Sequence, residues 1–306
     1  MAAWIGIGAS LVAGAYWMNP AFALLGCMAV RLGLQTNPIP SALNSSKLGK
    51  MSLQTAIVLL GLTLGADRLI DVSAEYGIAV AVYVLGTLAI GWVLAILFRR
   101  RTATEQLLSG GTAICGGTAI ATLAPILRAA PHEFAVSTAL VFLLNVVALL
   151  TFPTIGAWLD MSQATFGAWV ALAVHDTSSV VATASLYGVE AQEVATTVKL
   201  GRTLWLIPLA FVASLAYRGA DAKLRVPTFV LMFVAAAVVA TFVPIGPDIQ
   251  SAILLISKLL LVLALGMIGL DIDRETLSQL SAGAVLYGSL LWLIVAPLSL
   301  LLVWYL

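Results

Sequence analysis

Long apolar stretches separated by short polar segments occupy nearly the whole chain. The nine uninterrupted stretches are residues 4–18, 20–34, 50–65, 76–98, 134–158, 196–217, 226–243, 251–270 and 282–306. A helix needs about 20 apolar residues to cross the hydrocarbon core of a bilayer. The pattern therefore predicts an all-α polytopic membrane protein with about nine spanning helices.

Two further stretches, residues 104–130 and 162–188, are long enough to cross but are interrupted in the middle. In the first, the pentapeptide GGTAI begins at Gly110 and again at Gly116, so four glycines and two threonines fall within nine positions. Glycine disfavours the interior of a helix. In the second, five consecutive polar residues run from His175 to Ser179. Non-helical backbone at membrane depth needs protein or water around it, so we expect two broken or re-entrant helices at one interior site.

The order of these segments predicts a single transmembrane transporter domain over residues 1–306. Each interrupted segment is followed by one long helix, and the two helices run in opposite senses, as in the inverted repeats of secondary transporters. A weaker similarity relates residues 37–62 to residues 243–267, again in opposite directions. The positive-inside rule places Arg99, Arg100 and Arg101 in the cytoplasm, and the N-terminus is then cytoplasmic as well.

Composition narrows the function classes. Apolar residues make up 61% of the chain and charged residues 9%, against about 25% charged residues in a soluble domain. Fifteen basic residues nearly balance fourteen acidic ones, which excludes the basic surface that nucleic-acid binding requires. The two cysteines, Cys27 and Cys115, offer neither a disulfide framework nor a metal cluster. The lipid bilayer is the expected partner.

In each interrupted segment the chain re-enters a helix at glycine or hydroxyl residues. The two expected helix starts are Gly116-Gly117-Thr118 and Asp176-Thr177-Ser178. Helix N-termini carry unpaired N–H groups and partial positive charge, so two of them meeting near the midplane would bind an anion. Neutral hydroxyl donors would come from Thr112, Thr118, Thr177, Ser178 and Ser179. Alternatively, the glycines only permit close helix packing and the hydroxyls bond to main-chain carbonyls.

The ionisable residues near the breaks each have a functional and a structural interpretation. Asp176 either serves the site, as intramembrane acids usually do, or caps the following helix. His175 either couples protons or bonds a carbonyl. Lys199 and Arg202 share a helix face and either reach the site, pair with Asp176, or extend to the membrane interface. Asn145, alone in an apolar run, indicates an interhelical hydrogen bond.

Three motifs, at residues 110–125, 174–188 and 195–209, resemble in order and spacing the YeiH family of bacterial inner-membrane proteins, also called the sulfate exporter family. The resemblance implies crossed discontinuous helices in a mobile core beside a scaffold. By the same resemblance, the binding site would comprise Thr112, Cys115, Gly116, His175, Asp176 and Ser179, backed by Lys199 and Arg202.

These observations favour a secondary-active exporter or exchanger of a small anion such as sulfate, sulfite or an organic sulfonate. No phosphate-binding loop of the G-x-x-x-x-G-K-[ST] type is present, so an ion gradient would drive transport, with protons coupled through His175 or sodium through Asp176. No other cofactor is expected, and a homodimer stays open. The alternatives are a sodium- or proton-coupled carrier of an organic carboxylate, an anion channel, and an intramembrane enzyme. The enzyme is disfavoured because the chain has no G-x-S-x-G motif and no second membrane-buried aspartate to form a dyad.

Overall fold

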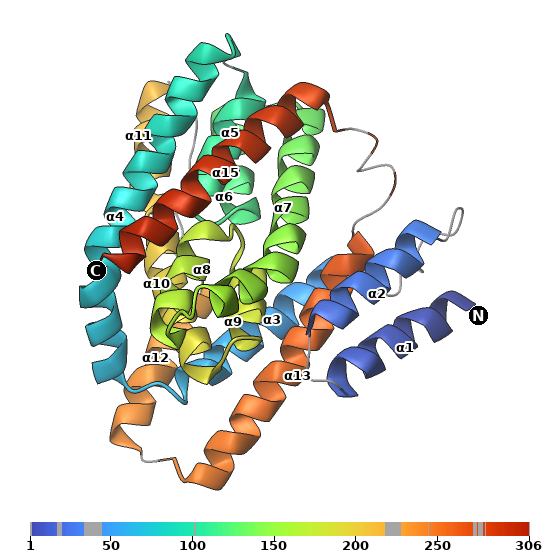
Figure 1. The fold of residues 1–306 in the computed structure, drawn as a ribbon, viewed down its shortest axis with the longest axis vertical. Coiled ribbons are helices and arrows are strands. Elements are labelled where there is room, and N and C mark those ends of the chain that lie inside the picture. Colours follow the sequence, from blue (N-terminus) through green and yellow to red (C-terminus); the bar gives the residue numbers. More distant parts are fainter. Residues whose placement is uncertain are drawn as a thin grey trace. The chain divides into compact units, whose positions relative to one another are not determined.

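The computed structural model describes residues 2–16, 20–33, 45–100, 102–217, 228–243, 245–271 and 280–305, with positions 274 and 278. All regular structure in these residues is helical. The chain forms two compact units (Figure 1). The first unit is Met1–Ile70 with Pro227–Leu277, and the second is Asp71–Val226 with Ser278–Leu306. The single domain over residues 1–306 stays a prediction.

The first unit contains helices from both of its sequence ranges. They are α1 (Ala2–Tyr16), α2 (Pro20–Gly33), α3 (Ser45–Gly61), α12 (Thr228–Phe242) and α13 (Pro247–Asp271). Helix α13 packs against α1, α2 and α3, and α12 packs against α3. A β-carbon on Gly61 would lie 2.6 Å from the Phe233 carbonyl oxygen. Small residues therefore bring α3 and α12 into close contact, as is common between membrane helices.

Five of the nine predicted spans coincide with helices that are long and apolar enough to cross a membrane. The predicted spans 4–18, 20–34, 50–65 and 226–243 are helices of 15, 14, 17 and 15 residues, shorter than the usual 20. The similarity between residues 37–62 and 243–267 falls partly on residues 37–44 and 244, which lie outside the described residues.

Four predicted helix starts were wrong by four residues or more. Helix α4 begins at Ala66 rather than at residue 76, the helix predicted from residue 196 begins at Val189, α3 begins at Ser45 rather than at residue 50, and α13 begins at Pro247 rather than at residue 251. The first turn of α3 contains serine and lysine residues, and the other three helices carry an acidic residue in their first turn, where the helix dipole favours negative charge. Polar first turns extend a helix beyond the apolar run that hydropathy detects.

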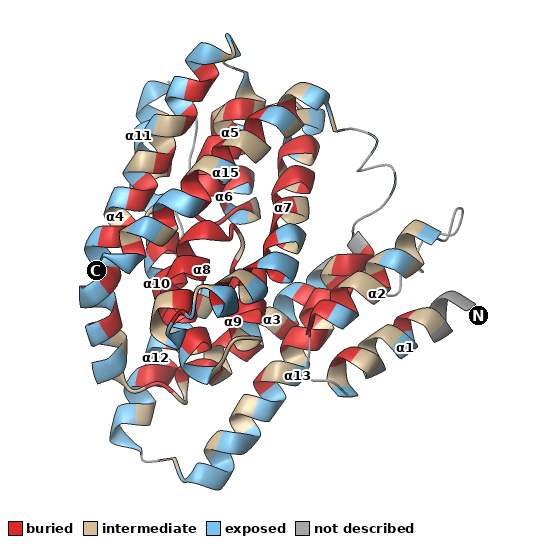
Figure 2. Ribbon diagram, viewed as in Figure 1, coloured by how far each residue is buried: buried red, intermediate tan, exposed pale blue. Residues whose placement is uncertain are grey.

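The second unit contains the two interrupted segments. Its helices are α4 (Ala66–Leu97, from Asp71 onward), α5 (Ala103–Ala113), α6 (Gly117–Ile126), α7 (Pro131–Trp158), α8 (Gln163–Ala173), α9 (Thr177–Ser185), α10 (Val189–Leu204), α11 (Leu206–Ala216) and α15 (Ala282–Trp304). Buried residues concentrate in α5, α8 and α9 (Figure 2). A helix buried on all sides has no lipid-facing surface, so these short helices form the interior of the unit.

Helices α5 and α6 form a re-entrant hairpin, called hairpin 1 below. Leu123 of α6 packs against Gly110 of α5, and a β-carbon on Gly111 would lie 3.0 Å from Ile120 Cγ1. These partners are placed nearly symmetrically about the turn at residues 114–116. Such pairing is only compatible with α6 returning along α5, because a continuing helix would carry them apart by 1.5 Å per residue.

Helices α8 and α9 form a second re-entrant hairpin, hairpin 2. The ring of Tyr187, just beyond α9, stacks on Phe166 near the start of α8, with 3.9 Å between ring centroids. The Tyr187 hydroxyl donates to the Met161 carbonyl oxygen at 2.7 Å. The side-chain oxygen of Gln163 accepts from the backbone N–H of Glu190 at 3.1 Å. The start of α8 and the end of α9 therefore lie together at the base of this hairpin.

The two hairpins enter the second unit from opposite ends. Hairpin 1 leads directly into the start of the 28-residue helix α7, and hairpin 2 follows the end of that helix. A helix of this length places its two ends about 40 Å apart. Helices α10 and α11 run the other way, from Gln163 at the base of hairpin 2 to the base of hairpin 1, where the Tyr217 hydroxyl donates to Gln106 at 2.6 Å. Of the two forms expected for the interrupted segments, the structure has the re-entrant one.

Re-entry sets the side of the membrane on which each turn lies. In a chain with Cys27 and Cys115 replaced by alanine, we expect Arg99→Cys and Arg128→Cys to react with a membrane-impermeant maleimide from one side and Asp160→Cys from the other. Right-side-out and inverted vesicles provide the measurement. Labelling of positions 99 and 128 from opposite sides would show that residues 104–130 cross the membrane instead.

Candidate functional site at the hairpin tips

The tips of the two hairpins meet inside the second unit. The Thr112 hydroxyl oxygen lies 3.1 Å from His175 Nε2. A β-carbon on Gly116 would lie 3.2 Å from His175 Cβ and 3.0 Å from Val141 Cγ1 on α7. Thr112, Cys115 and His175 are all buried. The structure therefore brings the two predicted breaks together at one interior place.

Gly116 produces the turn of hairpin 1. Its φ of 59° and ψ of −120° lie in a region that residues with a β-carbon rarely adopt. Its N–H donates to the Gly111 carbonyl oxygen at 2.8 Å, which closes the end of α5. Helix α6 then begins at Gly117 without a side-chain cap. The second GGTAI repeat thus breaks the helix because its first glycine must adopt this conformation.

Lys199 and Arg202 on α10 satisfy the carbonyl ends of both hairpins. Lys199 Nζ donates to the carbonyl oxygens of Ile114 at 3.2 Å and Val174 at 2.8 Å. The Arg202 guanidinium donates to carbonyl oxygens at the ends of α5 and α8, namely those of Thr112, Ala113, Ala171, Leu172 and Val174. The last carbonyls of a helix have no partner within it and carry partial negative charge. The two cations therefore compensate two helix ends at once.

This position decides between the alternatives left open for Lys199 and Arg202. Both side chains are fully buried, so neither extends to a membrane interface. Their hydrogen bonds go to main-chain oxygens rather than to the carboxylate of Asp176. Tyr83 of α4 completes the group, with the Arg202 guanidinium carbon 4.6 Å from the centre of its ring. Nothing in the apolar sequence around Tyr83 distinguished it from an ordinary membrane aromatic.

Asp176 caps helix α9, as one of its two interpretations predicted. One carboxylate oxygen accepts from the backbone N–H of Ser178 at 2.9 Å, and the other accepts from that of Ser179 at 3.2 Å. The hydroxyls of both serines also donate to this carboxylate, at 2.6 and 2.7 Å. The donors that the sequence assigned to an anion at α9 are therefore already used by Asp176, and the neighbouring Thr177 is buried.

The start of α6 is different from the start of α9. Gly117 is half-buried and Thr118 is exposed, and the N-cap residue Gly116 has no side chain with which to bond the first N–H groups. Partial positive charge at a helix N-terminus favours an anion. Of the two N-termini predicted to bind an anion, only that of α6 lacks a side-chain cap.

Asn145 of α7 connects to the tip of hairpin 2. Its side-chain oxygen accepts from the backbone N–H of His175 at 3.0 Å and lies 3.1 Å from His175 Nδ1. Because that oxygen can only accept, Nδ1 carries a proton, and Nε2 faces the Thr112 hydroxyl. The Asn145 amide nitrogen donates to Asp176 at 3.5 Å. The interhelical role predicted for Asn145 is confirmed, and His175 bridges α7 to hairpin 1.

Within the described residues, no group of three His, Cys, Asp or Glu side chains is arranged to hold a metal ion. The polar groups at the tips are hydroxyls, one imidazole, one carboxylate, two cations and main-chain amides. Such a set has the chemistry to bind a solute through hydrogen bonds and charge, and in the described part of the chain it offers no metal site.

Known sequences match most of the chain. The model of the family Conserved hypothetical protein 698 matches residues 2–288. A UPF0324 membrane protein of Geobacter sulfurreducens is 39% identical over 285 residues, covering 93% of this chain and 90% of that protein. Similar proteins of Photobacterium profundum and Porphyromonas gingivalis are 40% and 39% identical, over 92% and 93% of this chain and 85% and 86% of theirs. No solved structure matches.

Proposed function

We propose that this chain, which belongs to the Conserved hypothetical protein 698 family of UPF0324 membrane proteins, is a secondary-active transporter of a small anion. The membership confirms the resemblance to the YeiH family. The observation that carries the proposal is the meeting of two re-entrant hairpin tips at Thr112 and His175. Transporters build their substrate sites from interrupted helices whose ends converge near the midplane.

The charges at the tips favour an anionic substrate. The donors of Lys199 and Arg202 offset the partial negative charge at the carbonyl ends of α5 and α8, so these helix ends do not repel an anion at the tips. The uncapped start of α6 adds partial positive charge at Gly117 and Thr118, on the accessible side of hairpin 1. Sulfate, sulfite or an organic sulfonate fits this environment, because each presents several oxygens to main-chain N–H and hydroxyl donors.

The opposed hairpins suggest how access alternates. Hairpin 1 with α7 and hairpin 2 with α10 and α11 are arranged as inverted repeats, each hairpin followed by 28 helical residues that run in the opposite direction. In the bacterial inner membrane, with the N-terminus in the cytoplasm, hairpin 1 closes the cytoplasmic side and hairpin 2 the outer side. Rocking of one repeat against the other exposes the site to each side in turn. The protein is then a gradient-driven carrier without a catalytic step.

The half-buried carboxylate of Asp176 favours a second candidate function, a cation-coupled carrier. A sodium ion or a proton bound there would couple the carrier to an ion gradient, with an organic carboxylate as the substrate at α6. Five donors on Asn145, Ser178 and Ser179 already surround the carboxylate, so a cation would have to displace some of them. Because of this cost, the cation-coupled carboxylate carrier ranks below the anion carrier as the proposed function.

A ligand panel tests the proposal. The melting temperature of purified protein would be measured with sulfate, sulfite, taurine, dicarboxylates, chloride and sodium, because a ligand that binds the folded state stabilises it. A shift with an inorganic oxyanion or a sulfonate supports the anion carrier. A shift with dicarboxylates only when sodium or low pH accompanies them supports the second candidate.

Thr118→Asp should separate substrate binding from folding. A carboxylate in the first turn of a helix stabilises it, so the melting temperature without ligand should stay within a few degrees of the unmodified protein's. The same charge should repel an anion at the start of α6. The ligand concentration needed for a given rise in melting temperature should therefore increase at least tenfold. Ala121→Asp, exposed on the same helix one turn further on, is the matched control and should bind nearly normally. Equal weakening in both variants would remove the site from the start of α6.

A further inference from the structure

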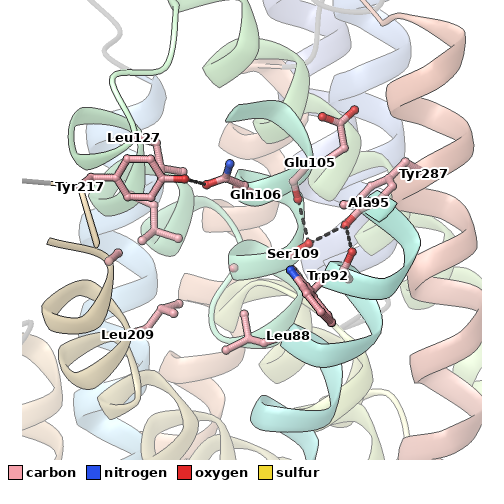
Figure 3. Close-up of a pocket in the computed structure, with 14 residues that line it drawn as sticks. Leu88, Trp92, Ala95, Glu105, Gln106, Ser109, Leu127, Leu209, Tyr217 and Tyr287 are labelled. Carbon is pink, nitrogen blue, oxygen red and sulfur yellow. Dashed lines mark hydrogen bonds between the residues drawn. The ribbon is translucent and has the colours of Figure 1, made fainter. Parts of the chain in front are cut away.

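A concave site lies along hairpin 1, on the side of α5 that runs from Glu105 near its start to Gly110, two residues before Thr112. It is a pocket of about 370 Å³ in the second unit, bordered by α4, α5, α6, α11 and α15 (Figure 3). Leu88, Trp92, Leu123 and Leu209 form much of its wall. The volume is within the range of small-molecule and cofactor pockets, and the proposed transport does not use it.

The hydroxyl groups of the pocket wall have hydrogen-bond partners within the protein. The Ser109 hydroxyl oxygen lies 2.7 Å from that of Tyr287, which in turn donates to the Gly91 carbonyl oxygen at 2.7 Å. The Tyr217 hydroxyl donates to the side-chain oxygen of Gln106. Figure 3 shows these bonds along the wall. With its hydroxyls satisfied internally, the pocket favours an apolar occupant over a polar solute.

The pocket borders helix surfaces that have the composition of a lipid-facing surface. Trp92 lines it and is 63% exposed. Further along α4, Leu97 is exposed, as are Phe211 and Leu215 on α11, the other helix at this border. Exposed aliphatic and aromatic side chains on both helices place the pocket next to hydrocarbon. An occupant that enters from this side is a hydrocarbon chain.

The same end of the unit carries exposed positive charge. Helix α4 ends at Leu97 and α6 at Ile126, and exposed Arg99, Arg100 and Arg128 follow them. Ala95 and Leu127, within one turn of these arginines, line the pocket. Two carboxylates at this end are committed to helix starts, since Glu105 accepts from the Thr102 N–H at 3.0 Å and Glu133 from the Ala130 N–H at 2.8 Å. The guanidinium groups therefore give this rim a positive charge.

We propose that this pocket binds one acyl chain of an anionic membrane phospholipid, whose phosphate lies at Arg99 and Arg128. An apolar pocket below a positive rim, at the level where the helices end, matches the distribution of polarity along such a lipid. Both arms of hairpin 1 line the pocket, through Ser109 and Gly110 on α5 and Leu123 and Leu127 on α6. A bound lipid therefore supports the base of the hairpin whose tip meets His175.

Native mass spectrometry of the detergent-purified full chain with phosphatidylglycerol tests this assignment. Ala213→Phe adds a ring to the pocket wall from α11, and Ala216→Phe adds the same ring at an exposed position that does not line the pocket. We expect Ala216→Phe to retain one tightly bound lipid and Ala213→Phe to bind it at least fivefold more weakly. Leu209→Phe, which also narrows the pocket, replaces Ala213→Phe if that variant does not fold. Retention of the lipid by the pocket variant would overturn the assignment.

The headgroup is tested separately with phosphatidylcholine of the same acyl chains. The unmodified protein should bind phosphatidylglycerol at least threefold more tightly, and Arg128→Gln should reduce that preference while the acyl chain still binds. Equal binding of the two lipids by the unmodified protein would overturn the role of the arginines. Displacement of the lipid by sulfate or taurine would overturn the lipid assignment, because it would show that the pocket binds the transported solute.

Discussion

Replacing Arg202 with methionine is expected to remove most of the protein's stability. The guanidinium group donates to the carbonyl ends of α5 and α8, and methionine would leave the buried oxygens of Ala113, Ala171 and Leu172 without donors. The Thr112 oxygen would keep only the Tyr83 hydroxyl, at 3.4 Å. Each unsatisfied buried group costs about 1–3 kcal/mol, so three of them would offset much of the 5–15 kcal/mol by which a protein is typically stable. We therefore expect little folded protein and a melting temperature at least 15 °C lower in whatever is recovered.

Size-exclusion chromatography followed by thermal melting measures this effect. Lys199→Met, which removes donors to two carbonyls rather than five, should be destabilised less. Arg128→Met, an exposed arginine at the base of hairpin 1, is the control for loss of a positive charge alone and should melt nearly normally. If Arg202→Met melts like Arg128→Met, Arg202 does not hold the hairpin ends.

Gly116→Ala is expected to have the second-largest effect. A β-carbon at this position meets His175 Cβ at 3.2 Å and Val141 Cγ1 at 3.0 Å, and φ is +59°. Strain of this kind costs about 1–3 kcal/mol, and relieving it would separate the tips. We expect a melting temperature lower by about 5–10 °C and loss of the anion-induced shift.

The neighbouring glycine provides a matched control for this substitution. A β-carbon on Gly117 would meet only Phe142 Cζ, at the ordinary distance of 3.8 Å. Alanine also favours a helix more than glycine does, so Gly117→Ala should melt at or above the temperature of the unmodified protein. Thermal melting of both variants in parallel gives the comparison. Equal destabilisation of the two would mean that the turn tolerates a side chain and that contact between the tips does not depend on Gly116.

The charges at the hairpin tips follow the dipoles of the interrupted helices. Two cations lie at carbonyl ends, and the carboxylate of Asp176 lies at the N-terminus of α9. Each ionic group therefore gains a favourable interaction with the backbone at a depth where water is scarce. The start of α6 is the exception among the four helix ends at the tips, since no side chain caps it.

Much of the architecture could be predicted from the sequence, because it depends on local residue preferences. The helix breaks fall at residues 114–116 and 174–176, where glycine and polar side chains interrupt apolar runs. Capping by Asp176 and the interhelical role of Asn145 followed from their residue types and neighbours. The four wrong helix starts share one cause, since hydropathy detects the apolar part of a helix but not a polar first turn.

The sequence by itself therefore determined that the chain is a helical membrane protein with two interrupted segments, where those segments break, and the family to which it belongs. Only the tertiary structure decided that both segments turn back, that His175 contacts Thr112, and that Lys199 and Arg202 bond to main-chain carbonyls 25 to 90 positions away. Local preference ends a helix but does not set the direction of the chain after the break. That direction depends on packing between distant residues such as Gly110 and Leu123 or Phe166 and Tyr187, and it places the carbonyl ends of α5 and α8 within reach of α10.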